Sequence, residues 1–295
     1  SSNSSSSLDF KLQRAVLDVE HGKPGSVPAA TLWSHGKSSV LPPVTMVFAS
    51  VEGARQLARR HRVLACATHR ILSETLRAIL RDQDSPATGY LCREQEGDLK
   101  YMIVFSSPRS AMEWCLVVQQ ALLHAPWPEE LLEQPGFETM YSDVVAAPSV
   151  RQLLFRGPRL KMGVCEGCPR TISPDHLGRA DFQGASVNQA ARYMAAAAHG
   201  GMIACELSLA QRVLQEWAMQ QGDGRGDGTP DTPVVVQHLG VYQFKGSGVQ
   251  EMASFTTQTL AARPFPDEPP CSGKGQRLKA QRGLVVGMAP LGRPI

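Results

Sequence analysis

The feature that most constrains the fold is a change of pattern that begins at residue 44. Residues 44–49 form a short apolar, partly β-branched run after the pair Pro42-Pro43, which is typical of a buried strand. From Val51 to Leu80 the apolar residues instead recur at helical spacing, with arginine and histidine on the opposite side. A chain that passes from a buried strand into a long amphipathic stretch must pack helices against a sheet.

The same two patterns alternate along the rest of the chain. Residues 96–98 (Glu-Gly-Asp) supply turn chemistry between two strand-like runs, which predicts a hairpin. The alternation predicts an α+β fold, a sandwich with helices around one mostly antiparallel sheet. The expected strands are 89–94, 101–105, 159–165, 202–205, 233–238 and 251–256, and the expected helices are 111–124, 184–198 and 208–219.

The composition divides the chain into one domain with two flexible ends. Residues 1–42 mix serine, glycine and proline without a sustained period, which predicts a flexible lead-in. The domain is expected over 43–258, with an irregular insertion at 125–158. Past 258 the sequence turns to proline, glycine, lysine and arginine, so 259–295 is predicted to be a flexible tail.

Charge and cysteine content restrict the partners. The chain has 30 Lys plus Arg against 27 Asp plus Glu, so its net charge of +3 does not indicate a nucleic-acid or membrane surface. No run of about 18 apolar residues occurs within it. The 7 cysteines are scattered and odd in number, which favours a reducing compartment. We therefore expect a cytoplasmic domain, which could belong to a longer or membrane-attached chain.

Two short motifs carry weak signals. Residues 165–168 (Cys-Glu-Gly-Cys) have the spacing of half a zinc site, but no second pair follows, so a structural role is expected. Residues 272–275 (Ser-Gly-Lys-Gly) lack the upstream glycine of a phosphate-binding P-loop.

Six motifs follow one another along the chain, at 44–52, 107–130, 160–164, 181–192, 200–203 and 239–246. In this order they resemble the catalytic domain of class III adenylyl and guanylyl cyclases, and the fungal and protist adenylyl cyclases in particular. The resemblance implies a ferredoxin-like α+β domain that works as a dimer, with Mg²⁺ or Mn²⁺ and a nucleoside triphosphate held between two domains. One domain there supplies the metal ligands, and the other supplies the residues that contact base, ribose and phosphates.

The metal half departs from the family pattern. Ser50 stands where the family's first strand ends in a metal-binding aspartate. Asp98 matches the second metal aspartate, but one extra residue follows it, so its carboxylate either still faces the metal or is displaced. Lys161 stands where the family has an arginine, which keeps the charge and loses the bidentate fork. Glu52 is an alternative ligand, and an exposed turn is the alternative role for Asp98.

The substrate half matches the family better. Asn188 and Arg192 lie four residues apart, hence on one helix face. The resemblance assigns them to orienting the ribose and stabilising charge on the α-phosphate, and it assigns Lys245 to the triphosphate. Asp181 matches the aspartate that accepts a hydrogen bond from the adenine amino group. Glu94 stands at the position of the adenine-reading lysine and resembles the glutamate of guanylyl cyclases.

The base is therefore ambiguous, because Asp181 and Glu94 offer two acceptors and no donor. Arg93 could supply the donor if the extra residue shifts the strand register, although neighbouring strand residues point to opposite faces. The sequence modestly favours ATP over GTP. The expected function is conversion of ATP, or GTP, to the 3',5'-cyclic nucleotide and pyrophosphate, with a second cyclase domain as partner. The alternative is an inactive pseudo-cyclase that binds nucleotide or serves as a regulatory or scaffold dimerisation module.

Overall fold

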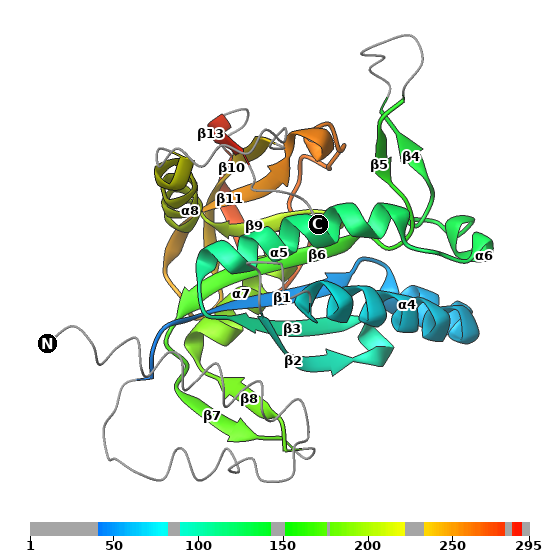
Figure 1. Ribbon diagram of the computed structural model, residues 1–295, viewed down its shortest axis with the longest axis horizontal. Coiled ribbons are helices and arrows are strands. Elements are labelled where there is room, and N and C mark those ends of the chain that lie inside the picture. The colour runs from blue at the N-terminus through cyan, green and yellow to red at the C-terminus, as the bar shows by residue number, and fades with distance from the viewer. Residues whose placement is uncertain are drawn as a thin grey trace, which may run out of the picture.

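The computed structural model describes residues 41–81, 89–142, 151–175, 178–221, 233–280 and 285–290. Their strands form one large mixed sheet, in the order β12-β10-β11-β9-β6-β1-β3-β2, with β13 also pairing with β10 (Figure 1). The strands of this sheet are β1 (Val44–Val51), β2 (Gly89–Gln95), β3 (Lys100–Phe105), β6 (Leu160–Gly167), β9 (Ile203–Glu206), β10 (Pro233–Phe244), β11 (Val249–Thr257), β12 (Gly275–Lys279) and β13 (Val285–Pro290). The helices are α3 (Ala54–Arg60), α4 (Arg62–Arg81), α5 (Pro108–His124), α6 (Glu129–Leu132), α7 (Ala185–Ala196) and α8 (Leu207–Gln221).

The first half of the domain has the ferredoxin-like order of elements. A strand, helices, a hairpin, a helix and a further strand place four neighbours in the order β6-β1-β3-β2, all antiparallel. β6 and β9 form a parallel pair, so the sheet is mixed. The predicted α+β fold with a mostly antiparallel sheet is confirmed.

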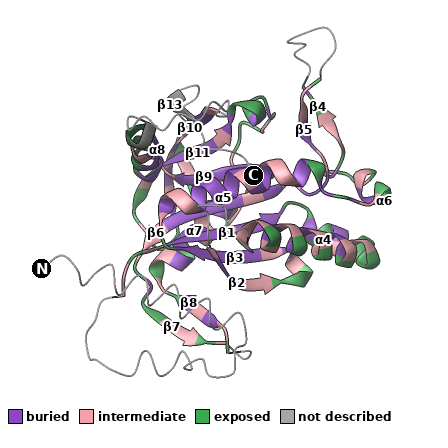
Figure 2. Cartoon of the chain, viewed as in Figure 1, coloured by how far each residue is buried: buried purple, intermediate pink, exposed green. Residues whose placement is uncertain are grey.

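Helices cover both faces of the sheet. One buried cluster joins the sheet to α3, α4, α5 and α8, and a second joins its other face to α7. Figure 2 shows the buried residues concentrated in the sheet and along α5, while α4 is exposed on its outer side. α7 packs closely on β6, because a Cβ at Gly163 would lie 2.2 Å from the backbone oxygen of Ala190. This contact fixes α7, and thus Asn188 and Arg192, on the sheet.

The hairpin of β2 and β3 departs from regular pairing in two places. A β-bulge interrupts β2 between Leu91 and Arg93. The turn itself is a short 3-10 helix, Glu96–Asp98, followed by Leu99 in the left-handed region at φ 45°. The Leu99 side chain is only 1% exposed, and its carbonyl accepts a hydrogen bond from the Val51 amide. The turn is thereby tied to the end of β1.

The structure contains regular elements in two of the segments that were predicted to be irregular or flexible. The tail predicted at 259–295 is in part folded, because β12 and β13 pair with the outer edge of β10. The insertion at 125–158 contains α6 and a two-stranded hairpin of β4 (Met140–Tyr141) and β5 (Leu153–Phe155), and it buries Trp127 and Phe137. The predicted lead-in, apart from its last two residues, lies outside the described residues. Within the part of the chain that the structure describes, no helix is both long and apolar enough to span a membrane.

The hairpin just before α7 was not predicted from the sequence. It consists of β7 (Thr171–Pro174) and β8 (Ala180–Gln183), which pair with each other and precede α7. β8 contacts β2, so this hairpin brings Asp181 to the edge of the large sheet.

Candidate active site

The end of β1 carries Ser50 between two lysines. Ser50 is 5% exposed, and its register partners are Lys100 on β3 and Lys161 on β6. Directly opposed residues of antiparallel strands point to the same face, with Cβ atoms about 5 Å apart. The three side chains therefore form one row across the sheet, on the face that α7 covers.

Asp98 is held by two cations. Its Oδ1 accepts a hydrogen bond from Arg55 Nε at 2.7 Å, and its Oδ2 accepts one from Arg55 Nη2 at 3.0 Å and one from Lys100 Nζ at 2.8 Å. The hydrogen bonds from Arg55 and Lys100 hold the pKa of the Asp98 carboxyl well below its usual range. Both carboxylate oxygens of Asp98, the predicted metal ligand, thus accept hydrogen bonds from Arg55 on α3 and Lys100 on β3.

Lys161 is half-buried beside this pair. Burial lowers the pKa of its ammonium and the charge of Lys100 adds to the effect, while Glu52 acts in the opposite direction. Glu52 itself accepts a hydrogen bond from the Gly200 amide at 2.9 Å. It therefore holds the loop before β9 instead of joining Asp98 at the end of β1.

These residues do not fit a pair of divalent cations. Magnesium requires hard, preferably anionic oxygen ligands, whereas the position between Lys100 and Lys161 offers one neutral hydroxyl. A divalent ion about 5 Å from a single ammonium would be repelled by roughly 7 kcal/mol at an effective dielectric constant of about 20. Among the described residues, no group of three or more His, Cys, Asp or Glu side chains is placed to hold a metal.

The predicted substrate residues on α7 lie near the turn after β10. Asn188 is exposed on α7, and Arg192 is half-buried one turn later. Arg192 donates to Gln189 Oε1 at 3.1 Å. A Cβ at Gly246 would lie 3.5 Å from Arg192 Nη2, so this turn comes close to the guanidinium. The structure therefore places the turn that carries Lys245 beside Arg192.

Lys245 begins that turn, and the C-terminal segment adds a lysine next to it. The Lys245 side chain is exposed, and its amide donates to the Lys274 carbonyl at 2.9 Å. Gly275 is the register partner of Phe244, so β12 holds Lys274 at the end of β10. Arg192, Lys245 and Lys274 thus bring positive charge to one end of the sheet, which suits a phosphate chain.

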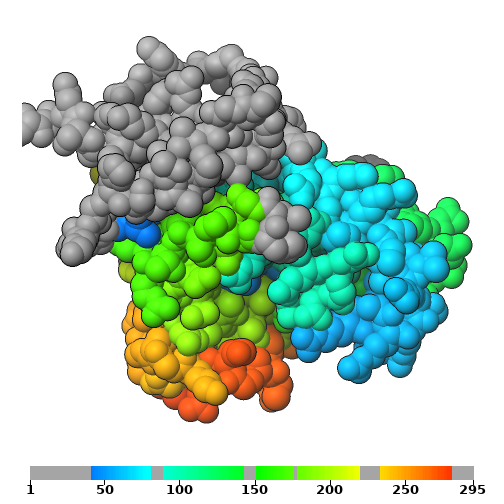
Figure 3. Space-filling model, turned by 90° about the horizontal axis from the view of Figure 1, so that it is seen from below, coloured from blue at the N-terminus to red at the C-terminus, as the bar shows by residue number. Residues whose placement is uncertain are grey.

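Asp181 pairs with Arg93. Arg93 donates through Nε to Oδ1 and through Nη2, at 2.7 Å, to Oδ2 of Asp181. Burial acts to raise the pKa of the Asp181 carboxyl, but the hydrogen bonds and charge of Arg93 outweigh it and lower the pKa. The bulge between Leu91 and Arg93 makes the pair possible, because it turns Arg93 to the face where β8 lies. Figure 3 shows this face, with a hollow between the teal hairpin of β2 and β3 and the green surface of β8 and α7.

Glu94 lies on the other face of the sheet. It accepts hydrogen bonds from Ser73 and, at 2.7 Å, from Arg77 Nη2, and it lies 3.0 Å from His69 Nε2, all on α4. Burial acts to raise the pKa of Glu94, but these hydrogen bonds and charges lower it overall. The structure therefore does not bring Glu94 together with Asp181.

Arg55 and Lys100 are the site residues that the sequence reasoning missed. Lys100 could have been found from the additional residue between Asp98 and Tyr101. When β3 pairs with β1, this residue places Lys100 opposite Ser50. Arg55 gives no signal of its own, since an arginine in the first turn of an amphipathic helix is usually solvated.

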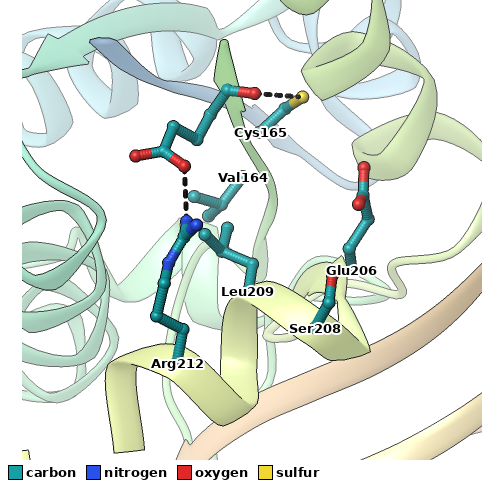
Figure 4. A pocket seen from close by; sticks show the side chains of 7 residues that line it. Val164, Cys165, Glu206, Ser208, Leu209 and Arg212 are labelled. Carbon is teal, nitrogen blue, oxygen red and sulfur yellow. Dashed lines mark hydrogen bonds and ion pairs between the residues drawn. The ribbon is translucent and has the colours of Figure 1, made fainter. Parts of the chain in front are cut away.

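A small polar pocket lies at the other end of β6 (Figure 4). Arg212 of α8 pairs with Glu166 on one side, and Glu206 accepts a hydrogen bond from Tyr193. The pocket begins at Val164, about 10 Å along β6 from Lys161, and no predicted site residue lines it. It is separate from the candidate site.

Comparisons with known proteins find curated adenylate cyclases among the similar sequences. No protein-family model matches the sequence. The adenylate cyclase of Schizosaccharomyces pombe is 27% identical over 219 residues, which are 72% of this chain and 12% of that protein. The adenylate cyclase of Mycosarcoma maydis is 35% identical over 125 residues, which are 42% of this chain and 5% of that protein. The chain thus spans a small part of the length of these relatives.

Solved structures have the same fold. A structure from an analysis of adenylate cyclases from Trypanosoma brucei in their monomeric state superposes with a TM-score of 0.57 at 20% sequence identity. The superposition covers 84% of this chain and 98% of that one. A second structure of the same kind gives a TM-score of 0.55 at 20% identity, over 79% of this chain and 96% of that chain.

Proposed function

We propose that the chain carries a class III nucleotidyl cyclase domain and that this domain contributes the substrate half of a dimeric cyclase site. A second cyclase domain would supply the carboxylates that Ser50 and the engaged Asp98 do not. The reaction is conversion of a nucleoside triphosphate, ATP in preference to GTP, to the 3',5'-cyclic nucleotide and pyrophosphate. The observation that carries the proposal is the placement of Arg192 beside the turn of Lys245, on a chain whose metal half is blocked by cations.

The chemistry requires positioning and charge neutralisation. The 3'-hydroxyl oxygen attacks the α-phosphorus in line, the bond to the bridging oxygen breaks, and pyrophosphate leaves with the electron pair. Arg192 would stabilise the charge that grows on the α-phosphate, and Asn188 would orient the ribose from the same helix face. Lys245 would neutralise the leaving pyrophosphate as a flexible point charge. The hydroxyl proton must pass to a group outside this half of the site.

The pair of Arg93 and Asp181 supports adenine as the base. A carboxylate accepts a hydrogen bond from the amino group of adenine, and a guanidinium donates to its unprotonated ring nitrogen. Arg93 lies on β2 and Asp181 on β8, and these two strands contact each other. This arrangement supplies the donor that Asp181 and Glu94 lack as a pair.

A coupled assay tests the proposal. The purified chain is mixed with a metal-competent cyclase domain whose own arginine at the Arg192 position is replaced, and cyclic AMP and cyclic GMP are measured with Mg²⁺ or Mn²⁺. We expect product only when both are present. Arg192→Ala in this chain should lower that activity by about a hundredfold to a thousandfold. Arg70→Ala, on the exposed side of α4, is the matched control and should leave it unchanged. No product in any pairing would contradict the proposal.

A second candidate function is a pseudo-cyclase that binds nucleotide without turnover. The row of Lys100, Ser50 and Lys161 favours it, because this half of a site cannot use metal ions. The coupled assay, together with a calorimetric titration of the purified chain with ATP, separates the two functions. The pseudo-cyclase is favoured if the chain binds ATP and no pairing gives product, and if Arg192→Ala changes neither the binding nor the absence of product.

A further inference from the structure

The half of the site that lacks metal ligands has its own binding chemistry. Lys100 and Lys161 flank Ser50 on one face of the sheet, and their Cβ atoms are roughly 10 Å apart because they lie two strands away from each other. Flexible lysine side chains can converge on a ligand placed over Ser50 from that separation. We propose that this row binds a polyphosphate chain without any divalent cation, with the two ammonium groups in the place of metal ions.

The charges near the row support an anionic ligand. The negative charge of Asp98 is shared between Arg55 and Lys100, so one positive charge remains on this group. Lys161 adds a second, and Glu52, which is held by the Gly200 amide, opposes it. The net charge of these five side chains is therefore positive by one, counted as three cations against two carboxylates. A phosphate chain lowers this excess, whereas a divalent cation would increase it.

Hydrogen-bond donors are available in the same row. An ammonium group has three donors, and the contact of Lys100 with Asp98 uses one of them. The salt bridges among the described residues do not include Lys161. The Ser50 hydroxyl adds one more donor between the two. Charge-assisted hydrogen bonds of this kind are short and are about twice as strong as neutral ones.

The inference deepens the proposed function, because a nucleoside triphosphate is one source of such a chain, but it does not require turnover. The experiment is a calorimetric titration of the purified chain with inorganic tripolyphosphate and with ATP, each in excess EDTA and in excess Mg²⁺. We expect binding of tripolyphosphate in EDTA, and weaker binding with Mg²⁺, which competes for the anion. A ligand that binds only when Mg²⁺ is present would overturn the proposal.

Matched variants locate the site. Lys161→Gln should weaken tripolyphosphate binding about tenfold, and Ser50→Asp should weaken it at least as much, because its carboxylate would pair with both lysines. Lys279→Gln, an exposed lysine on β12 at the far side of the sheet, should have no effect. Thermal unfolding checks that each variant folds. If Lys245→Ala removes the binding while Lys161→Gln leaves it unchanged, the phosphate lies in the substrate half and the proposal is wrong.

The two ligands distinguish the sources of the phosphate chain. Equal weakening of tripolyphosphate and ATP by Lys161→Gln assigns the row to polyphosphates in general. Weakening of ATP alone assigns it to nucleotides. A failed coupled cyclase assay leaves these binding results unaffected, so the failure of one proposal is distinguishable from the failure of the other.

Discussion

At the scale of single residues, the pair of Arg93 and Asp181 decides what the base-reading position offers. Arg93 is 41% exposed and Asp181 is 15% exposed, so the pair stands at the surface of the domain with one better-buried partner. Its bidentate geometry fixes the orientation of both groups. A guanidinium has five N–H donors and a carboxylate about four acceptor positions, so a base that docks there can use those that the pair leaves free.

Removing this arginine should change stability and nucleotide affinity together. Arg93→Gln is expected to lower the free energy of unfolding by about 1 kcal/mol at neutral pH, since the pair is partly exposed. The pKa of Asp181 is lowered in the fold. Its stabilisation is therefore fully present above the unfolded pKa of about 3.9 and is lost as the pH falls through the lower folded pKa. Urea unfolding at neutral pH and at about pH 3 should show the difference from wild type shrinking at the lower pH.

The matched control is Arg77→Gln, which breaks a similar ion pair on the other face of the sheet. Arg77 Nη2 donates to Glu94 at 2.7 Å, and the two side chains are 32% and 17% exposed. It should cost a similar free energy of unfolding and leave the affinity for ATP unchanged, whereas Arg93→Gln should weaken that affinity about tenfold. Equal ATP affinities for the two variants would remove Arg93 from the nucleotide site.

At the scale of elements, the turn between β2 and β3 combines burial with backbone strain. Leu99 is 1% exposed and has φ 45°. This is the left-handed region, in which residues other than Gly, Asn and Asp are disfavoured. Burial and strain act in opposite directions on any replacement. The buried side chain stabilises the turn by more than the conformation costs, because deleting a buried leucine typically costs about 2–5 kcal/mol and the left-handed conformation about 1–2 kcal/mol.

This balance predicts that the glycine variant of Leu99 is more stable than the alanine variant, the reverse of the order expected from side-chain size alone. Leu99→Ala loses the packing and keeps the strain, so it should lower the free energy of unfolding by about 3 kcal/mol. Leu99→Gly loses slightly more packing but relieves the strain, so it should be less destabilised than Leu99→Ala by about 1 kcal/mol. Chemical denaturation of both variants measures the difference. A glycine variant that is less stable than the alanine variant would show that Leu99 is not held in the left-handed region.

The elements that could be predicted from the sequence are those with a hydropathy period. β1 and α7 were predicted because their apolar residues recur at strand and helix spacing. β12 was not, because its residues Gln276, Arg277 and Lys279 are polar and the strand is held by backbone pairing to the edge of β10. The face that Arg93 occupies also could not be predicted, because a bulge changes which side chains point inward without changing the composition of the strand.

At the scale of the whole molecule, Arg263 joins the C-terminal segment to three other parts of the domain. It is 6% exposed, and it donates to Gln119 Oε1 of α5 at 2.7 Å, to the Leu154 carbonyl of β5 at 2.8 Å and to the Gly201 carbonyl at 2.8 Å. Its guanidinium also lies over the Phe155 ring, 4.6 Å from the centroid. The insertion, the central helix, the loop before β9 and the segment after β11 therefore share one buried cation.

Breaking this junction should destabilise the domain as a whole. Arg263→Met keeps most of the side-chain volume but leaves three buried acceptors without their donor, so the free energy of unfolding should fall by about 3 kcal/mol. Lys279→Met, which replaces an exposed cation on β12 of the same segment, is the control and should cost less than about 1 kcal/mol. A loss of less than about 1 kcal/mol for Arg263→Met would mean that this junction contributes little to the fold.

The lysine row also bears on how this domain could change over generations. A mutation of Ser50 to aspartate would place the new carboxylate between Lys100 and Lys161, and Asp98 would still be paired with Arg55 and Lys100. Because neighbouring substitutions of this kind are strongly non-additive, no single exchange recreates an arrangement of ligands for metal ions. Selection acting on one codon at a time would find no advantage at the first step. This half of the domain is therefore difficult to convert into a metal site by single substitutions.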